Sequence, residues 1–323
     1  MKHAQLQIWL GSLVLAFFSV TAIATPLIIA HRGASGYLPE HTLEAAILAY
    51  AQGADYIEQD LVLSKDAVPV VLHDIHLDTV TDVAEHYPDR AREDGRFYVI
   101  DFTLAELKTL WVNERRDPEG HQVYPTRYRG NGHFRIATFT EQLELIQELN
   151  RTTNKQVGLY PEIKAPAFHR QEGQDISQIV MSLLREHDLD RSDARIFLQC
   201  FDFDEIKRLR TELNARLPII QLIGENAWRE STTDYAYLQS SEGLAEVARY
   251  AQGIGPWLPQ LIDINSGKPL SLVKQARAAG LVIHPYTLRV DDLHGEMSWS
   301  QWLKVLKDLQ IDGIFTDFPD RIR

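Results

Sequence analysis

Short apolar runs alternate with segments of helical periodicity along most of this chain. Runs of this length, bounded by polar or turn-forming residues, are typical of strands buried in the middle of a sheet. We expect strands at Leu27–Ala30, Tyr56–Leu63, Val157–Ile163, Ile196–Gln199, Ile219–Ile223, Gly253–Gly255, Leu281–Pro285 and Gly313–Thr316.

Most of these runs are followed by an amphipathic segment, which predicts a helix. Alternation of strand and helix implies parallel pairing with right-handed crossovers. About eight such units indicate a closed (β/α)₈ barrel, the TIM barrel. An open doubly wound sheet is the alternative, but no Gly-x-Gly-x-x-Gly turn follows any expected strand. The expected helices are Glu40–Ala51, Phe139–Asn150, Ser177–His187, Asp204–Leu213, Glu242–Ala251, Leu270–Ala279 and Ser298–Leu309.

One stretch, His76–Ala137, interrupts the alternation. It is polar and charged, contains turn pairs such as Asp94-Gly95, and has a single helical-looking piece at Leu104–Trp111. A separate domain is the alternative, but about 60 residues with so few apolar runs would fold poorly alone. We therefore expect an insertion at residues 76–137, after the second strand and over the barrel mouth.

The N-terminal residues 1–24 predict a signal peptide. An apolar stretch, Ile8–Val20, follows a weakly basic start and precedes the small-x-small pattern that ends at Ala24. A transmembrane anchor is the alternative, but the stretch is shorter than the roughly 20 residues that a span needs. We expect cleavage after Ala24, export to the periplasm, and a mature barrel domain over residues 25–323.

Composition narrows the class of partner. With 323 residues, 45% of them hydrophobic, the chain can bury a large core. A net charge of −12 argues against nucleic acid, which needs a basic face, but does not exclude a small anionic substrate. The single cysteine, Cys200, excludes an intramolecular disulfide, and its apolar surroundings predict a buried structural thiol.

The candidate catalytic and ligand-binding residues lie at the carboxyl ends of the expected strands. The first strand ends in His31-Arg32-Gly33, where a guanidinium fork and backbone amides can approach a phosphate. In the second strand Glu58 and Asp60 are two residues apart, so both project from one face. Two acids that point into a barrel mouth are costly unless a cation neutralises them.

Two further runs end in charged or titratable residues. The run Pro69–Leu72 is followed by His73, and the third strand ends in Glu162-Ile163-Lys164. Glu58, Asp60 and Glu162 would together offer an all-oxygen site, which suits Ca²⁺ or Mg²⁺ rather than zinc. His31 and His73 beside it could act as general acid and base.

Each of these features has an ordinary structural explanation. A Glu–Lys pair on a strand is usually a surface salt bridge, and a histidine at a strand end is usually structural. What favours function is that all of them fall where TIM-barrel enzymes place their sites. We expect four other histidines to be solvated and leave two more without a role; these are His86, His121, His133 and His187, and then His169 and His284.

Several motifs, taken in this order, resemble the glycerophosphodiester phosphodiesterase family, and most closely its periplasmic bacterial members. The similarity runs from about Leu27 to the C-terminus. His41 stands where an Asn is usual in the family, although the periplasmic members resemble this chain there, and its role is open. The motifs are His31–Thr42, Gly53–Asp60, Val71–Asp74, Pro161–Lys164, Leu198–Phe201 and Phe315–Pro319.

The resemblance implies a TIM barrel that cleaves sn-glycero-3-phosphoalcohols to an alcohol and glycerol 3-phosphate. It implies a bound Ca²⁺, with Mg²⁺ as the second choice, and it leaves open which histidine is the acid and whether a cyclic phosphate forms. We expect the insertion to wall in the glycerol end while the alcohol projects toward solvent. The implied residues are His31 and His73 for catalysis, Arg32 and Lys164 for the phosphate, and Glu58, Asp60 and Glu162 for the metal.

Two rival functions remain. A phospholipase that cuts intact lipids would need an apolar membrane-facing loop, and the insertion is charged, although Phe97 and Trp111 could contribute to one. A non-catalytic binding protein would need the pocket without the histidines and carboxylates. We expect a small-molecule substrate, no nucleic acid and no stable membrane anchor, and we leave a homodimer open.

Overall fold

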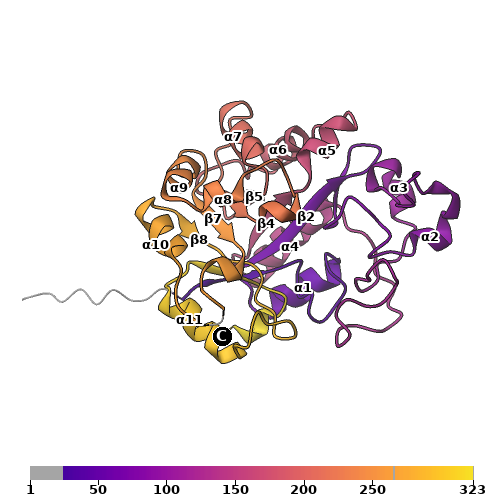
Figure 1. Cartoon of the computed structure of the whole chain (residues 1–323). Coiled ribbons are helices and arrows are strands. Elements are labelled where there is room, and N and C mark those ends of the chain that lie inside the picture. Colours follow the sequence, from indigo (N-terminus) through magenta and orange to yellow (C-terminus); the bar gives the residue numbers. More distant parts are fainter. Residues whose placement is uncertain (1–24, 265, 323) are drawn as a thin grey trace, which may run out of the picture.

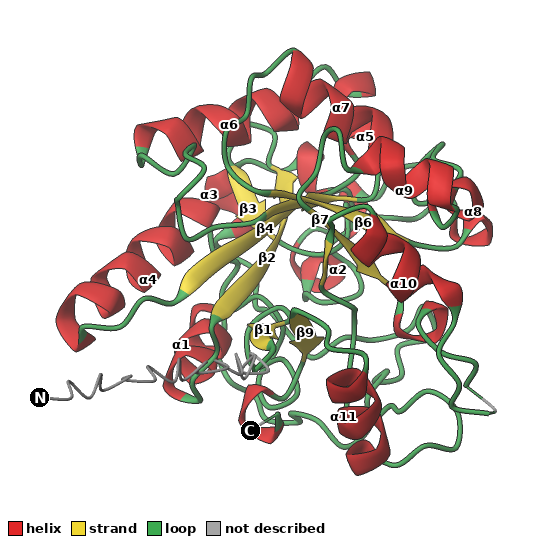
Figure 2. Cartoon of the chain, turned by 90° about the vertical axis from the view of Figure 1, so that its left-hand side faces the viewer, coloured by secondary structure: helices red, strands yellow, loops and turns green. Residues whose placement is uncertain are grey.

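The computed structural model describes residues 25–264 and 266–322, which form a barrel of strands surrounded by helices (Figures 1 and 2). The strands follow one another in the order β8-β7-β6-β5-β4-β2-β1-β9, and β3 pairs with β2 outside this path. Neighbouring strands along the path are parallel, as expected for alternating strands and helices. The bounds are β1 Leu27–Ala30, β2 Tyr56–Leu63, β3 Pro69–Val71, β4 Gly158–Ile163, β5 Leu198–Cys200, β6 Ile219–Ile223, β7 Gly253–Pro256, β8 Val282–Ile283 and β9 Gly313–Thr316.

The barrel is nearly closed between its two end strands. Near β8 and β9, Asp312 N–H donates to the Ile283 carbonyl, and Phe315 N–H donates to the Pro285 carbonyl, each at 3.0 Å. The predicted (β/α)₈ barrel is therefore confirmed, and an open doubly wound sheet is excluded.

Helices cover the outside of the barrel, and several begin at the capping residues that the sequence offers. The Thr42 side chain accepts a hydrogen bond from Ala45 N–H at the start of α1, and Thr138 and Ser298 form capping boxes for α4 and α11. The bounds are α1 Leu43–Ala51, α2 Val83–His86, α3 Leu104–Leu107, α4 Phe139–Thr153, α5 Pro166–Gln171, α6 Ile176–Glu186, α7 Phe203–Thr211, α8 Tyr235–Leu238, α9 Ser241–Val247, α10 Ser271–Ala278 and α11 Trp299–Asp308.

Strand alternation separates the barrel interior into a packed floor and a polar mouth. Alternate residues of a strand point to the same side, so Tyr56 is followed on its face by Glu58 and Asp60. On β4 the same alternation carries Tyr160 and then Glu162. The tyrosines pack with Ile29, Ile220 and Phe315 in a small buried cluster, which forms the floor below the acids.

The insertion is better packed than its sequence suggests. Strand β3 turns back antiparallel to β2, and residues of this hairpin pack with apolar side chains of the insertion. The helical piece expected at Leu104–Trp111 is shorter, α3, and α2 is an additional helix. Sequence periodicity missed this cluster because its apolar residues are scattered singly between turns. Its buried members are Val62, Val70, Leu72, Leu77, Val80, Val83, Phe97, Val99, Phe102, Leu107, Leu110, Val112, Phe134 and Ile136.

Some expectations concern the ends and single residues of the chain. The predicted signal peptide, residues 1–24, lies outside the described residues, and its cleavage stays a prediction. Across the described residues, no helix has the length and apolar character that a membrane crossing requires. Cys200 is buried, and burial raises the pKa of its thiol, in agreement with a structural role.

Candidate active site

The turn after β1 brings His31 and Arg32 to the barrel mouth. Arg32 and Gly33 both have positive φ angles, 58° and 81°, so the chain reverses sharply after the strand. A side chain at Gly33 would meet the backbone of Ala45 at 2.8 Å, which explains the glycine. The Arg32 backbone N–H donates to Glu58 Oε2 at 2.7 Å, and this ties the turn to β2.

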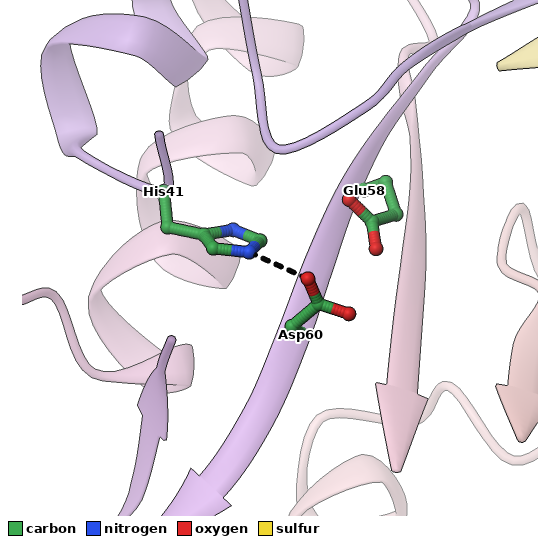
Figure 3. Close-up of side chains that lie close together, drawn as sticks. All are labelled: His41, Glu58 and Asp60. Atoms are coloured by element: carbon green, nitrogen blue, oxygen red, sulfur yellow. Dashed lines mark hydrogen bonds and ion pairs between the residues drawn. The ribbon is translucent and has the colours of Figure 1, made fainter. Parts of the chain in front are cut away.

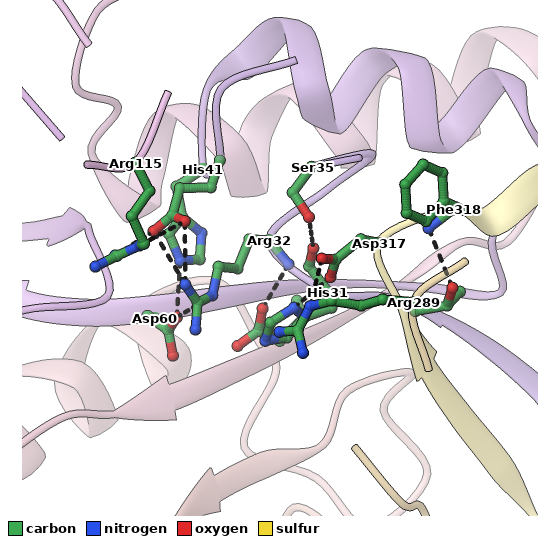
Figure 4. Close-up of polar contacts among 12 residues, drawn as sticks. His31, Arg32, Ser35, His41, Asp60, Arg115, Arg289, Asp317 and Phe318 are labelled. Atoms are coloured by element: carbon green, nitrogen blue, oxygen red, sulfur yellow. Dashed lines mark hydrogen bonds and ion pairs between the residues drawn. The ribbon is translucent and has the colours of Figure 1, made fainter. Parts of the chain in front are cut away.

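His31 is held by a buried carboxylate from the other end of the chain. Its Nδ1 lies 2.6 Å from Asp317 Oδ1, just beyond β9 (Figure 4). Asp317 Oδ2 in turn accepts hydrogen bonds from Arg127 and Arg289, both at 2.7 Å. Burial, assisted by the charge of Arg32, lowers the pKa of His31 to about 3, so the ring is neutral at neutral pH.

His73, which follows β3, is arranged in the same way as His31. The β2–β3 hairpin returns the chain, and Leu72 N–H donates to the Asp60 carbonyl at 3.0 Å, which places His73 beside β2. The Nδ1 of His73 lies 2.5 Å from Asp74 Oδ1. Burial and the nearby Arg32 and Lys164 lower its pKa to about 4. Each histidine therefore has Nδ1 engaged by a carboxylate, which leaves Nε2 for a ligand.

The predicted metal-binding acids converge, with one unexpected neighbour. Glu58 and Asp60 lie on β2, and ligand atoms of these two residues and of His41 lie within 4.8 Å of one another (Figure 3). Glu162 is outside this group of three but lies opposite Asp60 in the β2–β4 register and lines the same cavity. Burial raises the pKa of Glu58 well above its ordinary value and that of Glu162 to about 8.

His41 orients Asp60. Its Nε2 lies 2.8 Å from Asp60 Oδ2, whereas the buried Asp60 Oδ1 has no hydrogen-bond partner among the described residues. The φ angle of His41 is 65°, in the left-handed region that Asn, Asp and His adopt more readily than most residues. An imidazole that engages one carboxylate oxygen leaves the other for a cation, an arrangement common around metal sites. The donor set thus fits a divalent cation.

The two predicted phosphate ligands have different surroundings. Arg32 forms ion pairs with Glu40 at 3.1 Å and with Asp60 at 3.4 Å, and it lines the cavity. Lys164 lies 2.9 Å from Glu162 and is buried, and it does not line that cavity. The structure therefore places Arg32 at this cavity, whereas Lys164 lines a neighbouring cavity together with His73.

These groups face a catalytic cavity with a volume of about 180 Å³. Its lining combines His31, Arg32, His73 and the three acids with a group of aromatic side chains, which are Phe201, Trp228, Trp257 and Tyr286. A cavity with convergent charged groups and neutral histidines is suited to acid–base chemistry on an anionic ligand.

The glycerophosphoryl diester phosphodiesterase family model matches residues 31–321. The chain belongs to this family. It is 43% identical over 319 residues to a glycerophosphodiester phosphodiesterase of Haemophilus influenzae, covering 91% of this chain and 88% of the relative. The corresponding enzyme of Treponema pallidum is 36% identical over 322 residues, covering 91% and 90%. The predicted family and enzyme class, a phosphodiesterase, are thereby confirmed.

A solved structure agrees in fold. An Oleispira antarctica phosphodiesterase in complex with the product sn-glycerol-3-phosphate aligns with a TM-score of 0.62 and 23% identity, covering 92% of this chain and 95% of that one. At this identity the likeness supports the barrel and not the details of the site.

Sequence reasoning missed the residues that hold the predicted ones in place. Asp74 directly follows His73, so adjacency could have suggested it. Asp317 is 286 residues away from His31, and its signals are its position after a strand and its place in the motif Phe315–Pro319. Arg127 and Arg289 come from the insertion and from the loop after β8, where charged residues are common and carry no distinguishing pattern.

Proposed function

We propose that this enzyme hydrolyses sn-glycero-3-phosphoalcohols, such as glycerophosphocholine and glycerophosphoethanolamine, to an alcohol and sn-glycerol 3-phosphate. The observation that carries the proposal is the pair of histidines, each with Nδ1 engaged by a carboxylate, that face one cavity with Arg32 and buried acids. The names of the relatives and the product bound to the Oleispira structure support the same substrate class.

Arg32 and Arg289 are the cations that would receive the phosphate. Both line the catalytic cavity, and a guanidinium can donate two parallel hydrogen bonds to phosphate oxygens. Lys164, which lines a neighbouring cavity with His73, would act through its charge or after a side-chain movement. Fixing the diester between these groups and the histidines converts a bimolecular reaction into an intramolecular one, which is a large part of catalysis.

The two histidines would divide the proton transfers, one reacting as the neutral base and the other as the imidazolium. The Nε2 of the neutral histidine accepts the proton of the attacking oxygen, which belongs to water or to the glycerol hydroxyl, as the new bond to phosphorus forms. The other histidine, protonated on Nε2 when the anionic diester is bound beside it, gives that proton to the departing alcohol oxygen as its bond to phosphorus breaks. Attack by the glycerol hydroxyl gives a cyclic phosphate, which water then opens to the same product.

Glu58, Asp60 and Glu162 would hold the metal ion, with His41 orienting Asp60. Oxygen ligands favour Ca²⁺ or Mg²⁺, and we take Ca²⁺ as the resident ion because three carboxylates exceed the one or two that usually hold Mg²⁺. When bound, the ion supplies positive charge that neutralises the phosphate and acidifies a nearby hydroxyl or water.

Hydrolysis of glycerophosphocholine with and without calcium tests this proposal. We expect calcium to raise both the release of glycerol 3-phosphate and the melting temperature, because an ion that binds only the folded state stabilises it. A chelator should abolish the release of glycerol 3-phosphate and lower the melting temperature. Glu162→Gln should require more calcium for half-maximal activity, whereas Glu44→Gln, on the exposed side of α1, should match the wild type.

Two outcomes would count against the proposal. Full activity and unchanged melting in a chelator would remove the metal from the mechanism. No release of glycerol 3-phosphate from any glycerophosphodiester at saturating calcium would remove the substrate class itself.

A further inference from the structure

A second cavity adjoins the catalytic one and has no assigned role. Its volume is also about 180 Å³. The two cavities share four lining residues, His31, Arg32, His73 and Arg289. These are the groups proposed to hold the phosphate and to exchange protons with the attacking and departing oxygens, so the phosphate would lie where the two cavities meet.

A phosphodiester carries two ester arms that point away from phosphorus in different directions. A phosphate at the junction would therefore direct one arm into each cavity. The catalytic cavity contains Glu58, Asp60 and Glu162 and suits the glycerol arm, whose hydroxyls are oxygen ligands for a cation. The second cavity is then left for the alcohol that departs.

The walls of the second cavity come in large part from the insertion. Arg115 bridges Glu40 and Asp74, at 2.6 Å to each, and Arg127 bridges Asp291 and Asp317, at 2.8 Å and 2.7 Å. The Arg127 side chain is only 4% exposed, so this wall is rigidly built rather than a loose surface loop.

Tyr124 is the residue in this wall with spare hydrogen-bonding capacity. Its ring lies against the Arg127 guanidinium, 3.6 Å from the ring centre, with the Arg289 guanidinium at 5.7 Å. Within the described part of the chain, its hydroxyl forms no hydrogen bond. The ring is therefore already engaged by cations, and the hydroxyl is left to bind a ligand.

The charges that line the second cavity disfavour a cationic alcohol. Four guanidinium groups line it, from Arg32, Arg115, Arg127 and Arg289, against the carboxylates of Glu40 and Asp317. Asp74 and Asp291, the outer partners of Arg115 and Arg127, are not among its lining residues. Arginine N–H groups offer donors to hydroxyl oxygens and repel an ammonium group.

We propose that the second cavity binds the departing alcohol and selects hydroxyl-rich, uncharged alcohols over quaternary ammonium alcohols, with the Tyr124 hydroxyl as a specificity determinant. This inference depends on the proposed function and refines it. It also replaces the expectation that the alcohol projects into solvent, because the insertion walls in the alcohol arm rather than the glycerol arm.

The test compares two substrates that differ only in the alcohol, glycerophosphoglycerol and glycerophosphocholine. Wild-type enzyme should have the higher kcat/KM for glycerophosphoglycerol. Tyr124→Phe keeps the ring and removes the hydroxyl, so it should lower kcat/KM for glycerophosphoglycerol about 3- to 10-fold, the scale of one neutral hydrogen bond. The value for glycerophosphocholine should change less than about twofold.

Two further variants serve as controls. Tyr87→Phe makes the same change in the insertion but outside both cavities, where the hydroxyl contacts Thr109 at 3.0 Å, and both substrates should be unaffected. Trp228→Ala removes one of the aromatic side chains that line the catalytic cavity. It should change kcat/KM for both substrates to the same degree.

The inference is overturned if Tyr124→Phe leaves kcat/KM for glycerophosphoglycerol unchanged or lowers kcat/KM for both substrates equally. It is also overturned if wild-type enzyme prefers the choline diester and Trp228→Ala removes that preference, since the alcohol would then occupy the aromatic cavity. Neither result affects the proposed function, which fails only if neither diester yields glycerol 3-phosphate.

Discussion

At the scale of single residues, the site depends on groups that never need to touch the substrate. Asp317 accepts hydrogen bonds from His31, Arg127 and Arg289, and burial alone would raise its pKa. Arg289, His31 and Arg127 outweigh that effect and hold the pKa well below its usual range. Asp317 therefore remains ionised, and it fixes the proton of His31 on Nδ1.

Asp317→Asn should lower kcat by at least about 10-fold, because a carboxamide does not hold the imidazole in one tautomer. KM should change little, since Arg32 and Arg289 remain to bind the phosphate. Asp291→Asn is a matched control, because Asp291 pairs with Arg127 but not with His31. An Asp317→Asn enzyme with normal kcat and a raised KM would show that Asp317 serves the phosphate and not His31.

The sequence predicted the groups at the mouth better than their partners. The sequence placed His31, Arg32, His73 and the acids at the barrel mouth because each lies in or directly after an apolar run. Such runs can be recognised from neighbouring residues alone. Asp74 could have been suggested by its position next to His73, but the contact of Asp317 with His31, 286 residues away, depends on the completed fold. Lys164 was placed at the correct strand end, but its contact with Glu162 was not foreseen.

At the scale of elements, strand order was predictable and the insertion was not. Strands such as β4 and β6 are fully buried, so their sequences are mostly apolar and easy to recognise. The insertion buries its apolar residues one at a time and has no periodicity. It was expected to be a polar cover and instead shares a core with the β2–β3 hairpin.

Phe102→Ala should therefore destabilise the insertion. Phe102 is fully buried in that core, and truncation of a buried phenylalanine costs roughly 3–5 kcal/mol. Urea unfolding combined with limited proteolysis should show cleavage within residues 76–137 at lower urea than in the wild type. Ile47→Ala, at a position 45% exposed on α1, is the control and should cost little. Identical proteolysis of the two variants would mean that the insertion core contributes little stability.

At the scale of the whole molecule, two buried histidines couple folding to pH. His169 and His284, the two left without a role by the sequence, each have a pKa lowered to about 4 by burial. Below the unfolded value of about 6.5 the unfolded chain binds protons that the folded one does not, so stability falls as pH decreases from about 6.5 to 4. Each histidine contributes roughly 3 kcal/mol to this loss.

His169→Leu should make the melting temperature less sensitive to acid. Both ring nitrogens of His169 lack hydrogen-bond partners among the described residues, so the replacement leaves no buried group unsatisfied. The increase in melting temperature of this variant over the wild type should be larger at pH 4.5 than at pH 7.5. His121→Leu, whose wild-type side chain is 79% exposed, should show no such difference. Parallel pH profiles for His169→Leu and the wild type would exclude His169 as a source of acid sensitivity.

The way in which the insertion joins the barrel has an evolutionary consequence. Its two ends meet at the sheet, where Val71 N–H donates to the Ala137 carbonyl at 2.8 Å and Val70 bridges to Thr138. A segment that leaves and returns at one point can be lengthened or shortened at its surface turns without changing the connection between barrel strands. Chimeras joined there could acquire a new leaving-group preference by recombination if the exchanged segment keeps the arginines at positions 115 and 127, which hold Asp74 and Asp317.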